Sequence, residues 1–283
     1  MAASVLEVIL CLAAHAPWWI QLGAAVSLLI SSYVAGFCMQ TFRERLFPPL
    51  TNLQRRQYAH AWDALAESKE QAFAAAAGQS DESRLRRSAG VTVQNIMELA
   101  VVTLHDDILE VGCGVGRIGR ELSPHCRSWT GTDISANMLR YAADRLRGID
   151  NVRLVRLEGV GLPEFQNTSF DVVYFTNMMM HLDEMDRWFY LQEAFRVLRT
   201  EGRVFFDNID LESDAGWAMF ANDAKRYRHL ERPPYMPRLS TAWELRAYAS
   251  RAGFANVTSH QRSPVVIVTA VKPGLHSEND SPA

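Results

Sequence analysis

The sequence predicts an α/β protein built on a doubly wound sheet of seven strands. Short apolar runs alternate with helical segments at the spacing of parallel strands joined by crossover helices. The first of these runs, Ile108–Val111, leads directly into a glycine-rich turn and then a helix. A third observation concerns the N-terminus, where a long apolar stretch predicts a transmembrane helix ahead of the sheet. The 283 residues suffice for one large α/β domain with additions, or for two small domains.

The strands and helices follow one another in a regular order. Apolar runs predict strands at Ile108–Val111, Ser128–Thr132, Val152–Leu157, Phe170–Phe175, Arg203–Phe206, Asn256–His260 and Val265–Val271. Segments with helical composition predict helices at Val115–Leu122, Ala136–Arg147, Met185–Arg199 and Ala242–Ala252. A short turn joins the last two strands, so the sheet is expected to close with a hairpin.

The N-terminal segment, residues 1–46, is predicted to be a membrane anchor. From Val8 to Phe42 it carries no charged residue apart from His15. The 22 mostly apolar positions of Pro17–Cys38 would span roughly 30 Å as a helix, which is the thickness of the hydrocarbon layer. We therefore predict a single transmembrane helix at about residues 17–38.

The flanks of this apolar stretch set its predicted orientation. Trp18 and Trp19 precede it, and Arg43 and Arg45 follow it, which is typical of an aromatic belt and of positive charge on the cytoplasmic side. The catalytic part of the chain is then expected in the cytoplasm. The alternatives are a signal peptide cleaved near Ala14-His15-Ala16 and a buried amphipathic helix.

The rest of the chain divides into a cap, a main domain and a tail. Residues 47–90 are predicted to form a helical linker or N-terminal cap, with a helical stretch at Gln54–Gly78 and a polar break at Gln79–Arg87. The main domain is expected at 91–273, beginning with an amphipathic helix at Val91–Leu104 and carrying a lid insertion at 210–240. The polar residues 274–283 are predicted to be a disordered tail.

The segment after the first strand predicts a site for an adenosine-bearing cofactor. Gly114-x-Gly116-x-x-Gly119 lets the backbone approach a ligand closely, and the following helix directs unpaired N–H groups to the same place. Asp133 ends the second strand, where a carboxylate can hold ribose hydroxyls. The Glu110 carboxylate favours a sulfonium cofactor over one with a pyrophosphate, because it attracts the former and repels the latter.

From about Val91 to Lys272 the chain resembles class I S-adenosylmethionine-dependent methyltransferases of the small-molecule type. The resemblance rests on Glu110-x-Gly112-x-Gly114-x-Gly116, on Gly131-Thr132-Asp133-Ile134-Ser135, on Leu157-Glu158-Gly159-Val160-Gly161-Leu162-Pro163 and on the closing hairpin. It implies a Rossmann-like fold whose last strand is antiparallel. It also implies S-adenosyl-L-methionine as the cofactor, bound by Glu110, Gly112, Cys113, Gly114, Gly116, Asp133, Ile134, Met138, Glu158, Gly159 and Asn177.

Methyl transfer needs an aligned acceptor and, where the acceptor carries a proton, a base. His181, after the fourth strand, and Asp207, after the fifth, are the candidate catalytic residues. Structural roles compete with both: a histidine in an apolar run often only donates hydrogen bonds, and an aspartate at a strand end often caps a turn. Packing in the core is the favoured role of the three methionines before His181.

The acceptor is expected to be small and lipophilic rather than a nucleic acid. The segment 210–240 combines aromatic and basic residues, which suits an apolar substrate or a lipid headgroup, although a solvated helix face is the slightly favoured explanation of the charges. The net charge of −3 opposes binding to phosphate backbones. The four cysteines lack metal-site spacing, so we expect no disulfide and no bound metal.

These observations predict a membrane-anchored S-adenosylmethionine-dependent methyltransferase that acts on O or N of a small lipophilic acceptor. Two alternatives remain open at this point. One is an NAD(P)-dependent reductase of the same fold class, although the chain has no Tyr-x-x-x-Lys pair of the short-chain type. The other is a non-catalytic, membrane-bound scaffold.

Overall fold

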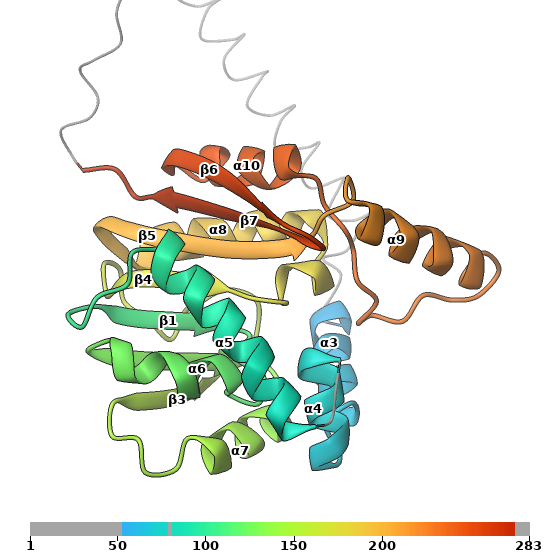
Figure 1. Cartoon of the computed structure of the whole chain (residues 1–283), viewed down its shortest axis with the longest axis horizontal. Helices are drawn as coiled ribbons and strands as arrows, with labels where there is room; N and C mark the ends of the chain where they lie inside the picture. Colours follow the sequence, from blue (N-terminus) through green and yellow to red (C-terminus); the bar gives the residue numbers. More distant parts are fainter. Residues whose placement is uncertain (1–52, 79–80, 275–283) are drawn as a thin grey trace, which may run out of the picture. The chain divides into compact units, whose positions relative to one another are not determined.

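The computed structural model describes residues 53–78 and 81–274. A sheet of seven strands lies at its centre in the order β3-β2-β1-β4-β5-β7-β6 (Figure 1). The strands are β1 Asp107–Val111, β2 Ser128–Asp133, β3 Val152–Arg156, β4 Phe170–Phe175, β5 Leu198–Ile209, β6 Ala255–Arg262 and β7 Val265–Val271. β1 to β5 are parallel, and β7 pairs antiparallel with both β5 and β6. The predicted seven-stranded α/β sheet with an antiparallel last strand is confirmed.

Helices cover both faces of the sheet (Figure 1). α5 Glu82–Leu99, α6 Arg117–Leu122 and α7 Ala136–Arg145 lie on one face, and α8 Glu184–Val197 and α10 Ala242–Arg251 on the other. Side chains alternate along β4, so Val172 and Tyr174 pack with α5 and α6, while Val173 and Phe175 pack with α8 and α10. The sheet is thus buried on both sides, which explains why its strands read as continuous apolar runs.

Two helices precede the sheet domain, α3 Leu53–Ala64 and α4 Lys69–Ala77. The predicted helical stretch Gln54–Gly78 is therefore interrupted, and the second helix begins with a capping box between Ser68 and Gln71. The predicted polar break at Gln79–Arg87 is wrong from residue 82 onward. Asp81 accepts a hydrogen bond from the Arg84 N–H (2.9 Å) and so begins α5 nine residues before the predicted start.

The fifth strand is longer than the predicted strand Arg203–Phe206 at both ends. β5 begins at Leu198 and passes through an irregularity in its pairing with β4 between Phe170 and Val172. Glu201 takes a φ of +61° there, and its N–H donates to the Lys272 carbonyl (2.9 Å). A β-bulge therefore interrupts the pairing of β4 and β5 near the start of β5.

Close packing against Trp129 explains why positions 119 and 131 are glycines. Its indole is fully buried between β2 and α6, and a Cβ at Gly119 or at Gly131 would lie 2.4 or 2.2 Å from its ring atoms. The third glycine of the Gly-x-Gly-x-x-Gly pattern therefore allows close helix–strand packing rather than ligand contact.

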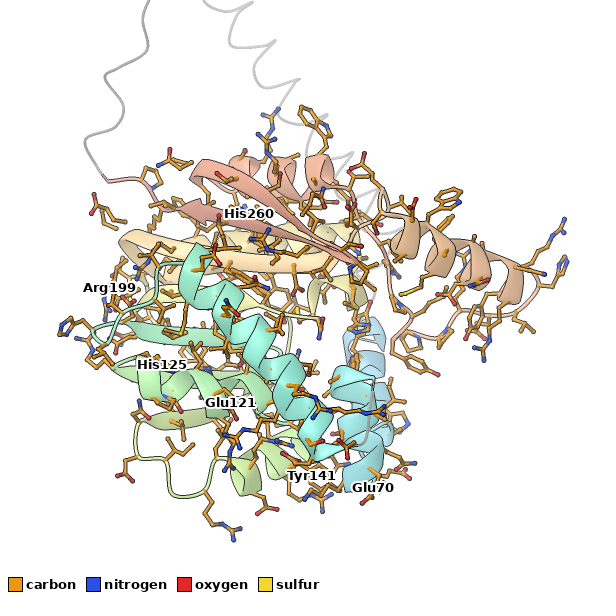
Figure 2. The ribbon with its side chains drawn as sticks, viewed as in Figure 1. Glu70, Glu121, His125, Tyr141, Arg199 and His260 are labelled. Carbon is orange, nitrogen blue, oxygen red and sulfur yellow. The ribbon has the colours of Figure 1, made fainter. Side chains whose placement is uncertain are left out.

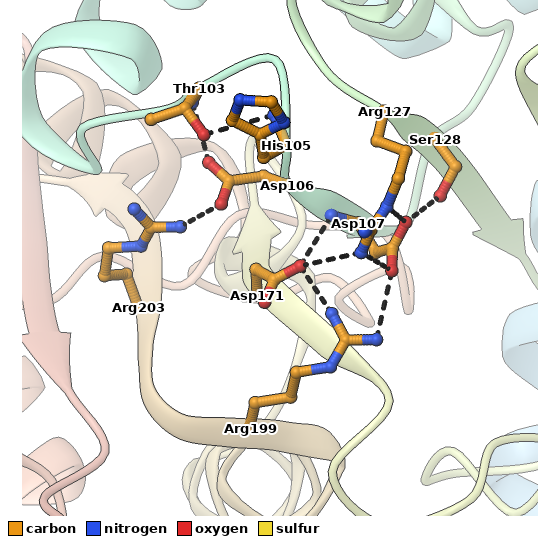
Figure 3. A network of polar contacts seen from close by, with 9 residues as sticks. All are labelled: Thr103, His105, Asp106, Asp107, Arg127, Ser128, Asp171, Arg199 and Arg203. Carbon is orange, nitrogen blue, oxygen red and sulfur yellow. Dashed lines mark hydrogen bonds and ion pairs between the residues drawn. The ribbon is translucent and has the colours of Figure 1, made fainter.

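An ionic network ties the amino ends of the parallel strands together, at the edge opposite the loops that follow them (Figure 3). Asp107 accepts hydrogen bonds from Arg127, from the Ser128 hydroxyl (2.7 Å) and from Arg199 (3.0 Å). Asp171 accepts from Arg199 and from the Asp107 N–H (2.8 Å). Figure 2 shows Arg199 at this end of the molecule, far from Tyr141 and Glu70.

The network makes stability depend on pH in a defined direction. Hydrogen bonds from Arg127, assisted by Ser128 and Arg199, hold the pKa of Asp107 well below its usual range. Because the folded-state pKa is depressed, the stabilisation is present above the unfolded pKa of about 4 and is lost as pH falls below it. We expect Asp107→Asn to lower the free energy of unfolding by about 1–2 kcal/mol at pH 7. The difference from the wild type should shrink at pH 3, as measured by urea unfolding.

Asp144→Asn is the matched control, since Asp144 forms an exposed ion pair with Arg147. It should change stability by less than about 0.5 kcal/mol at either pH. An Asp107→Asn effect that is equal at pH 7 and pH 3 would show that the network does not act through this charge.

No helix within the described ranges is long and apolar enough to cross a bilayer. The predicted anchor, with its transmembrane helix at 17–38, lies outside the residues that the structure describes, as does the predicted tail beyond Gly274.

Candidate active site

A cavity of about 710 Å³ lies where the carboxyl ends of β1, β2, β4 and β5 meet helices α3 and α4. This is the edge at which doubly wound sheets bind their ligands. Eight of the predicted cofactor-binding residues line it, namely Glu110, Gly112, Cys113, Gly114, Asp133, Ile134, Met138 and Asn177. The predicted catalytic residue His181 lines it as well. Their roles in binding and catalysis stay predictions, but the structure brings them to one place.

A positive backbone φ at Gly112 and backbone hydrogen bonds fix the conformation of the loop after β1. Gly112 has a φ of +80°, and a Cβ there would lie 2.6 Å from Met178 Cγ, so a larger residue does not fit. The N–H groups of Gly112 and Cys113 both donate to the Thr132 carbonyl (2.8 Å each). The Gly114 N–H donates to Asp133 Oδ2 (2.8 Å). The loop is therefore anchored to the end of β2.

Glu110 lines the cavity and accepts the last hydrogen bond in a chain of three buried side chains. The Trp129 Nε1–H donates to the Tyr174 hydroxyl (2.9 Å), which donates to Glu110 Oε2 (2.5 Å). Burial raises the pKa of Glu110 to about 7, while Tyr174 and the nearby Arg117 guanidinium oppose this shift. A cationic ligand in the cavity would favour the ionised carboxylate.

Asp133 is the second buried carboxylate of the cavity wall. Besides Gly114, it accepts a hydrogen bond from the Ser135 N–H (2.9 Å). Burial raises its pKa to about 6, against these backbone hydrogen bonds. The two carboxylates fit a cofactor that combines a positive charge with ribose hydroxyls.

Helices α3 and α4 close the cavity from above the glycine loop. Asp63 accepts hydrogen bonds from the Ser135 hydroxyl (2.7 Å) and the Asn137 N–H (3.1 Å), which docks α3 on the first turn of α7. The Tyr141 hydroxyl, labelled in Figure 2, donates to the Glu67 carbonyl (3.2 Å). A Cβ at Gly114 would lie 3.4 Å from Ala76 Cβ, so α4 covers the loop directly.

On the side of β5 and α9 the cavity wall is apolar, and we call this side the apolar end. It is lined by Met180, Leu182, Tyr190, Ile209, Met219 and Pro237, whereas Met178 lies beside Gly112. Two of the three consecutive methionines thus face the cavity, while Met179 packs in the core as predicted for all three. Met219 and Pro237 come from the segment predicted to be a lid.

His181 lies in this apolar part with a defined tautomer. Its Nδ1 is 2.8 Å from the Tyr235 carbonyl oxygen, which only accepts, so Nδ1 carries the proton and Nε2 keeps its lone pair. The Trp62 ring packs edge-on against the imidazole, with centroids 4.8 Å apart. Burial lowers the pKa of His181 to about 4, so the ring is neutral at physiological pH.

Four predicted site residues do not line the cavity. Asp207 is buried behind it and accepts the Asn177 N–H (2.8 Å), which holds Asn177 at its φ of +54°. Gly116 faces α7 instead, where a Cβ would lie 3.2 Å from Ala142 Cβ. Glu158 is exposed, and neither it nor Gly159 contributes to the lining.

Tyr58, Trp62 and Arg117 are among the lining residues that were not predicted from the sequence. Tyr58 and Trp62 come from α3, and no local pattern indicates that this helix covers the cavity. Arg117 directly follows the glycine loop and is 7% exposed. Burial lowers its pKa, and the Glu110 and Asp207 carboxylates oppose this shift. The sequence did offer one signal for Arg117, because it is a basic residue directly after the glycine loop and the first residue of α6.

The comparisons with known proteins point to methyltransferases. Residues 108–202 match the family described as "Methyltransferase domain". Over 103 residues the chain is 32% identical to a demethylmenaquinone methyltransferase of Tropheryma whipplei, covering 36% of this chain and 41% of that protein. Over 130 residues it is 32% identical to the 27-O-demethylrifamycin SV methyltransferase of Amycolatopsis mediterranei, covering 44% and 46%. The chain spans less than half the length of these curated relatives.

Solved structures share the fold. A SAM-dependent methyltransferase of Thermotoga maritima superposes with a TM-score of 0.52 at 20% identity, over 66% of this chain and 91% of that one. The [4+2]-cyclase SpnF superposes with a TM-score of 0.52 at 19% identity, over 66% and 82%. The fold by itself therefore does not decide the reaction. Together, the matched family and the carboxylate-lined glycine loop identify residues 108–202 as a SAM-dependent methyltransferase domain with S-adenosyl-L-methionine as its cofactor.

Proposed function

We propose that the protein transfers a methyl group from S-adenosyl-L-methionine to oxygen or nitrogen of a small lipophilic acceptor. The observation that carries this proposal is that carboxylates and apolar side chains line one cavity from different strands. Glu110 and Asp133 lie at the ends of β1 and β2, which form the polar end, and methionine, leucine, isoleucine and tyrosine side chains line the cavity on the side of β5 and α9. A polar cofactor and an apolar acceptor can therefore lie side by side, shielded from water.

In this proposal, different residues at the polar end bind different parts of the cofactor. The bound cofactor supplies a methyl group already activated by a positively charged sulfur. Glu110 counters that positive charge, Asp133 receives the ribose hydroxyls, and Met138 offers an apolar surface to the adenine. The hydrogen bonds of the Gly112–Gly114 backbone keep the loop in place before the ligand arrives.

His181 is the proposed base for an acceptor that arrives protonated. Its Nε2 lone pair is free to take a proton because Nδ1–H is fixed on the Tyr235 carbonyl. Met178 and Met180 line the cavity beside it. Asp207 acts through Asn177 and is a positioning residue rather than a catalytic one.

We expect His181→Asn to lower kcat about 100-fold or more, with the cofactor Kd changed less than about threefold. The rate of the wild type should stay flat between pH 6 and pH 8 and fall below about pH 5, because the imidazole becomes protonated only near its pKa of about 4. His125→Asn is the control, since His125 is exposed at the opposite end of the sheet (Figure 2). If the His181→Asn protein keeps the wild-type rate and pH profile, His181 is not the base.

The relatives support a small-molecule acceptor. By their names, those reported above act on demethylmenaquinone and on 27-O-demethylrifamycin SV. The proposed acceptor of this chain is likewise a small molecule, with an apolar body that fits the methionine-lined end of the cavity.

We place the protein at a membrane, with the catalytic domain on the cytoplasmic side. The uncharged stretch Pro17–Cys38 and the arginines after it support this part of the proposal. The full-length protein should then stay in the membrane pellet after an alkaline carbonate wash. Its release into the supernatant would contradict the anchor and would leave the methyl-transfer proposal to be judged separately.

The test of the acceptor class uses the full-length protein, a lipid extract of its host's membranes and S-adenosyl-L-methionine with a radioactive methyl group. Label should enter organic-soluble products and should be absent with a Gly114→Arg protein. Label confined to water-soluble products would show that the acceptor is not lipophilic.

A further inference from the structure

Helix α9, Asp214–Arg226, projects from the edge of the domain beyond α3 (Figure 1). Its amino end is fixed: the Ser213 hydroxyl accepts the Gly216 N–H (3.0 Å), and a Cβ at Gly216 would lie 1.9 Å from the Asp210 carbonyl oxygen. Gly216 is the buried residue of this helix. The rest of α9 extends into solvent although it is rich in apolar residues.

The helix has two distinct faces. Gly216, Met219 and Asp223 are buried or half-buried and follow the spacing i, i+3, i+7. The other face carries an apolar stripe of Trp217, Phe220, Ala221 and Ala224, at i, i+3, i+4 and i+7. All four are exposed; Trp217 is 59% and Phe220 43% exposed, and their rings stack with centroids 5.5 Å apart. Such a stripe normally packs against a partner.

A basic group continues this surface at the carboxyl end of α9. Lys225, Arg226, Arg228 and Arg232 are all exposed, and Glu231 is the one acidic residue between positions 225 and 232. We define the α9 surface as the apolar stripe together with these four basic side chains. Aromatic residues beside a cationic cluster are typical of a helix that lies in the interface of an anionic membrane.

The α9 surface borders the apolar end of the cavity. Met219, on the inner face of α9, lines that cavity, and so does Pro237 farther along the same segment. One helix therefore joins the exposed aromatic stripe to the wall of the proposed acceptor site. A molecule leaving a bilayer beneath α9 would reach the cavity without crossing bulk water.

The geometry points to an anionic lipid bilayer as the partner of the α9 surface. Trp217 and Phe220 enter the headgroup layer, the four basic side chains contact lipid phosphates, and the apolar acceptor passes from the bilayer to the cavity beside Met219. This inference rests on the proposed function, because it identifies the bilayer as the source of the lipophilic acceptor. It does not depend on the predicted anchor.

Hydrogen–deuterium exchange of the full-length protein in detergent-free vesicle suspensions tests this directly. Vesicles of phosphatidylcholine alone are compared with vesicles that also contain phosphatidylglycerol. We expect exchange in residues 214–226 to slow at least about fivefold with the anionic vesicles, and this protection to weaken at high salt. Because the readout is local, an anchor elsewhere in the chain does not produce it.

Two pairs of variants assign the effect to the stripe and to the charges. Trp217→Ala with Phe220→Ala should abolish the protection, whereas Trp243→Ala, at a tryptophan of α10 that is 77% exposed, should keep it. Arg226→Glu with Arg228→Glu should also abolish it. Arg84→Glu with Arg87→Glu, on the exposed side of α5, should have no effect.

Three results would overturn the inference: no change with anionic vesicles, equal protection by neutral vesicles, or full protection before vesicles are added. The last would mean that protein, not lipid, covers the stripe. Cofactor binding and methyl transfer to the lipid extract are measured on the same samples. Transfer without protection of α9 refutes the docking surface alone, and protection without transfer refutes the proposed function alone.

Discussion

Gly114→Arg is expected to weaken binding of S-adenosyl-L-methionine by at least about 100-fold. Gly114 has a φ of +52°, its N–H donates to Asp133, and a Cβ would already lie 3.4 Å from Ala76. A side chain there is strained by the backbone and enters the space between the loop and α4, where the cofactor is expected. Isothermal titration calorimetry measures the loss directly.

Gly148→Arg is the matched control for this prediction. Gly148 also has a positive φ, +83°, but a Cβ there would have nothing within 4 Å, and Gly148 does not line the cavity. It carries the same kind of backbone strain without occupying the site, so the cofactor affinity should stay within about threefold of wild type. If Gly114→Arg binds the cofactor normally, the glycine loop is not its site.

Arg187→Met is expected to lower the free energy of unfolding by about 3–5 kcal/mol. Arg187 is 1% exposed and donates hydrogen bonds to the Met179 carbonyl (2.9 Å), the Ser240 hydroxyl (2.7 Å) and the Arg238 carbonyl (2.6 Å). It also pairs with Glu244 at 3.3 Å. Methionine fills much of the volume but removes these buried, charge-assisted hydrogen bonds and the ion pair with Glu244.

The same substitution should raise the KM for the acceptor, because Arg187 fixes the backbone of the segments that flank His181 and Pro237. Urea unfolding and steady-state kinetics measure the two effects. Arg246→Met, at an exposed position of α10, should change stability by less than about 0.5 kcal/mol. A loss below about 1 kcal/mol for Arg187→Met would show that the flanking segments hold their positions without it.

Features encoded by neighbouring residues were predictable from the sequence. The strands follow from continuous apolar runs because both faces of the sheet are buried, and Phe170–Phe175 was placed to the residue. The glycine loop and Asp133 lie at the ends of adjacent strands, so their meeting at one edge follows from the topology. The eight predicted residues that line the cavity come mostly from these two strand ends.

Features that depend on distant contacts were not predictable. Trp62 reaches the cavity because Asp63 docks α3 on α7, a contact between residues 72 positions apart. Gly116 and Gly114 look equivalent in the sequence, but α7 packs against the first and the cavity opens at the second. Helix α9 was not predicted within the lid, because its apolar stripe faces solvent rather than a core.

The central claim is that the cavity at the carboxyl edge of the sheet binds S-adenosyl-L-methionine. Calorimetric titration of the detergent-solubilised full-length protein with S-adenosyl-L-methionine, S-adenosyl-L-homocysteine and NADH tests it most directly. We expect the first two to bind at a single site and NADH to give no heat of binding. Binding of NADH alone would make the protein a reductase, and no response to any of the three would favour a non-catalytic scaffold.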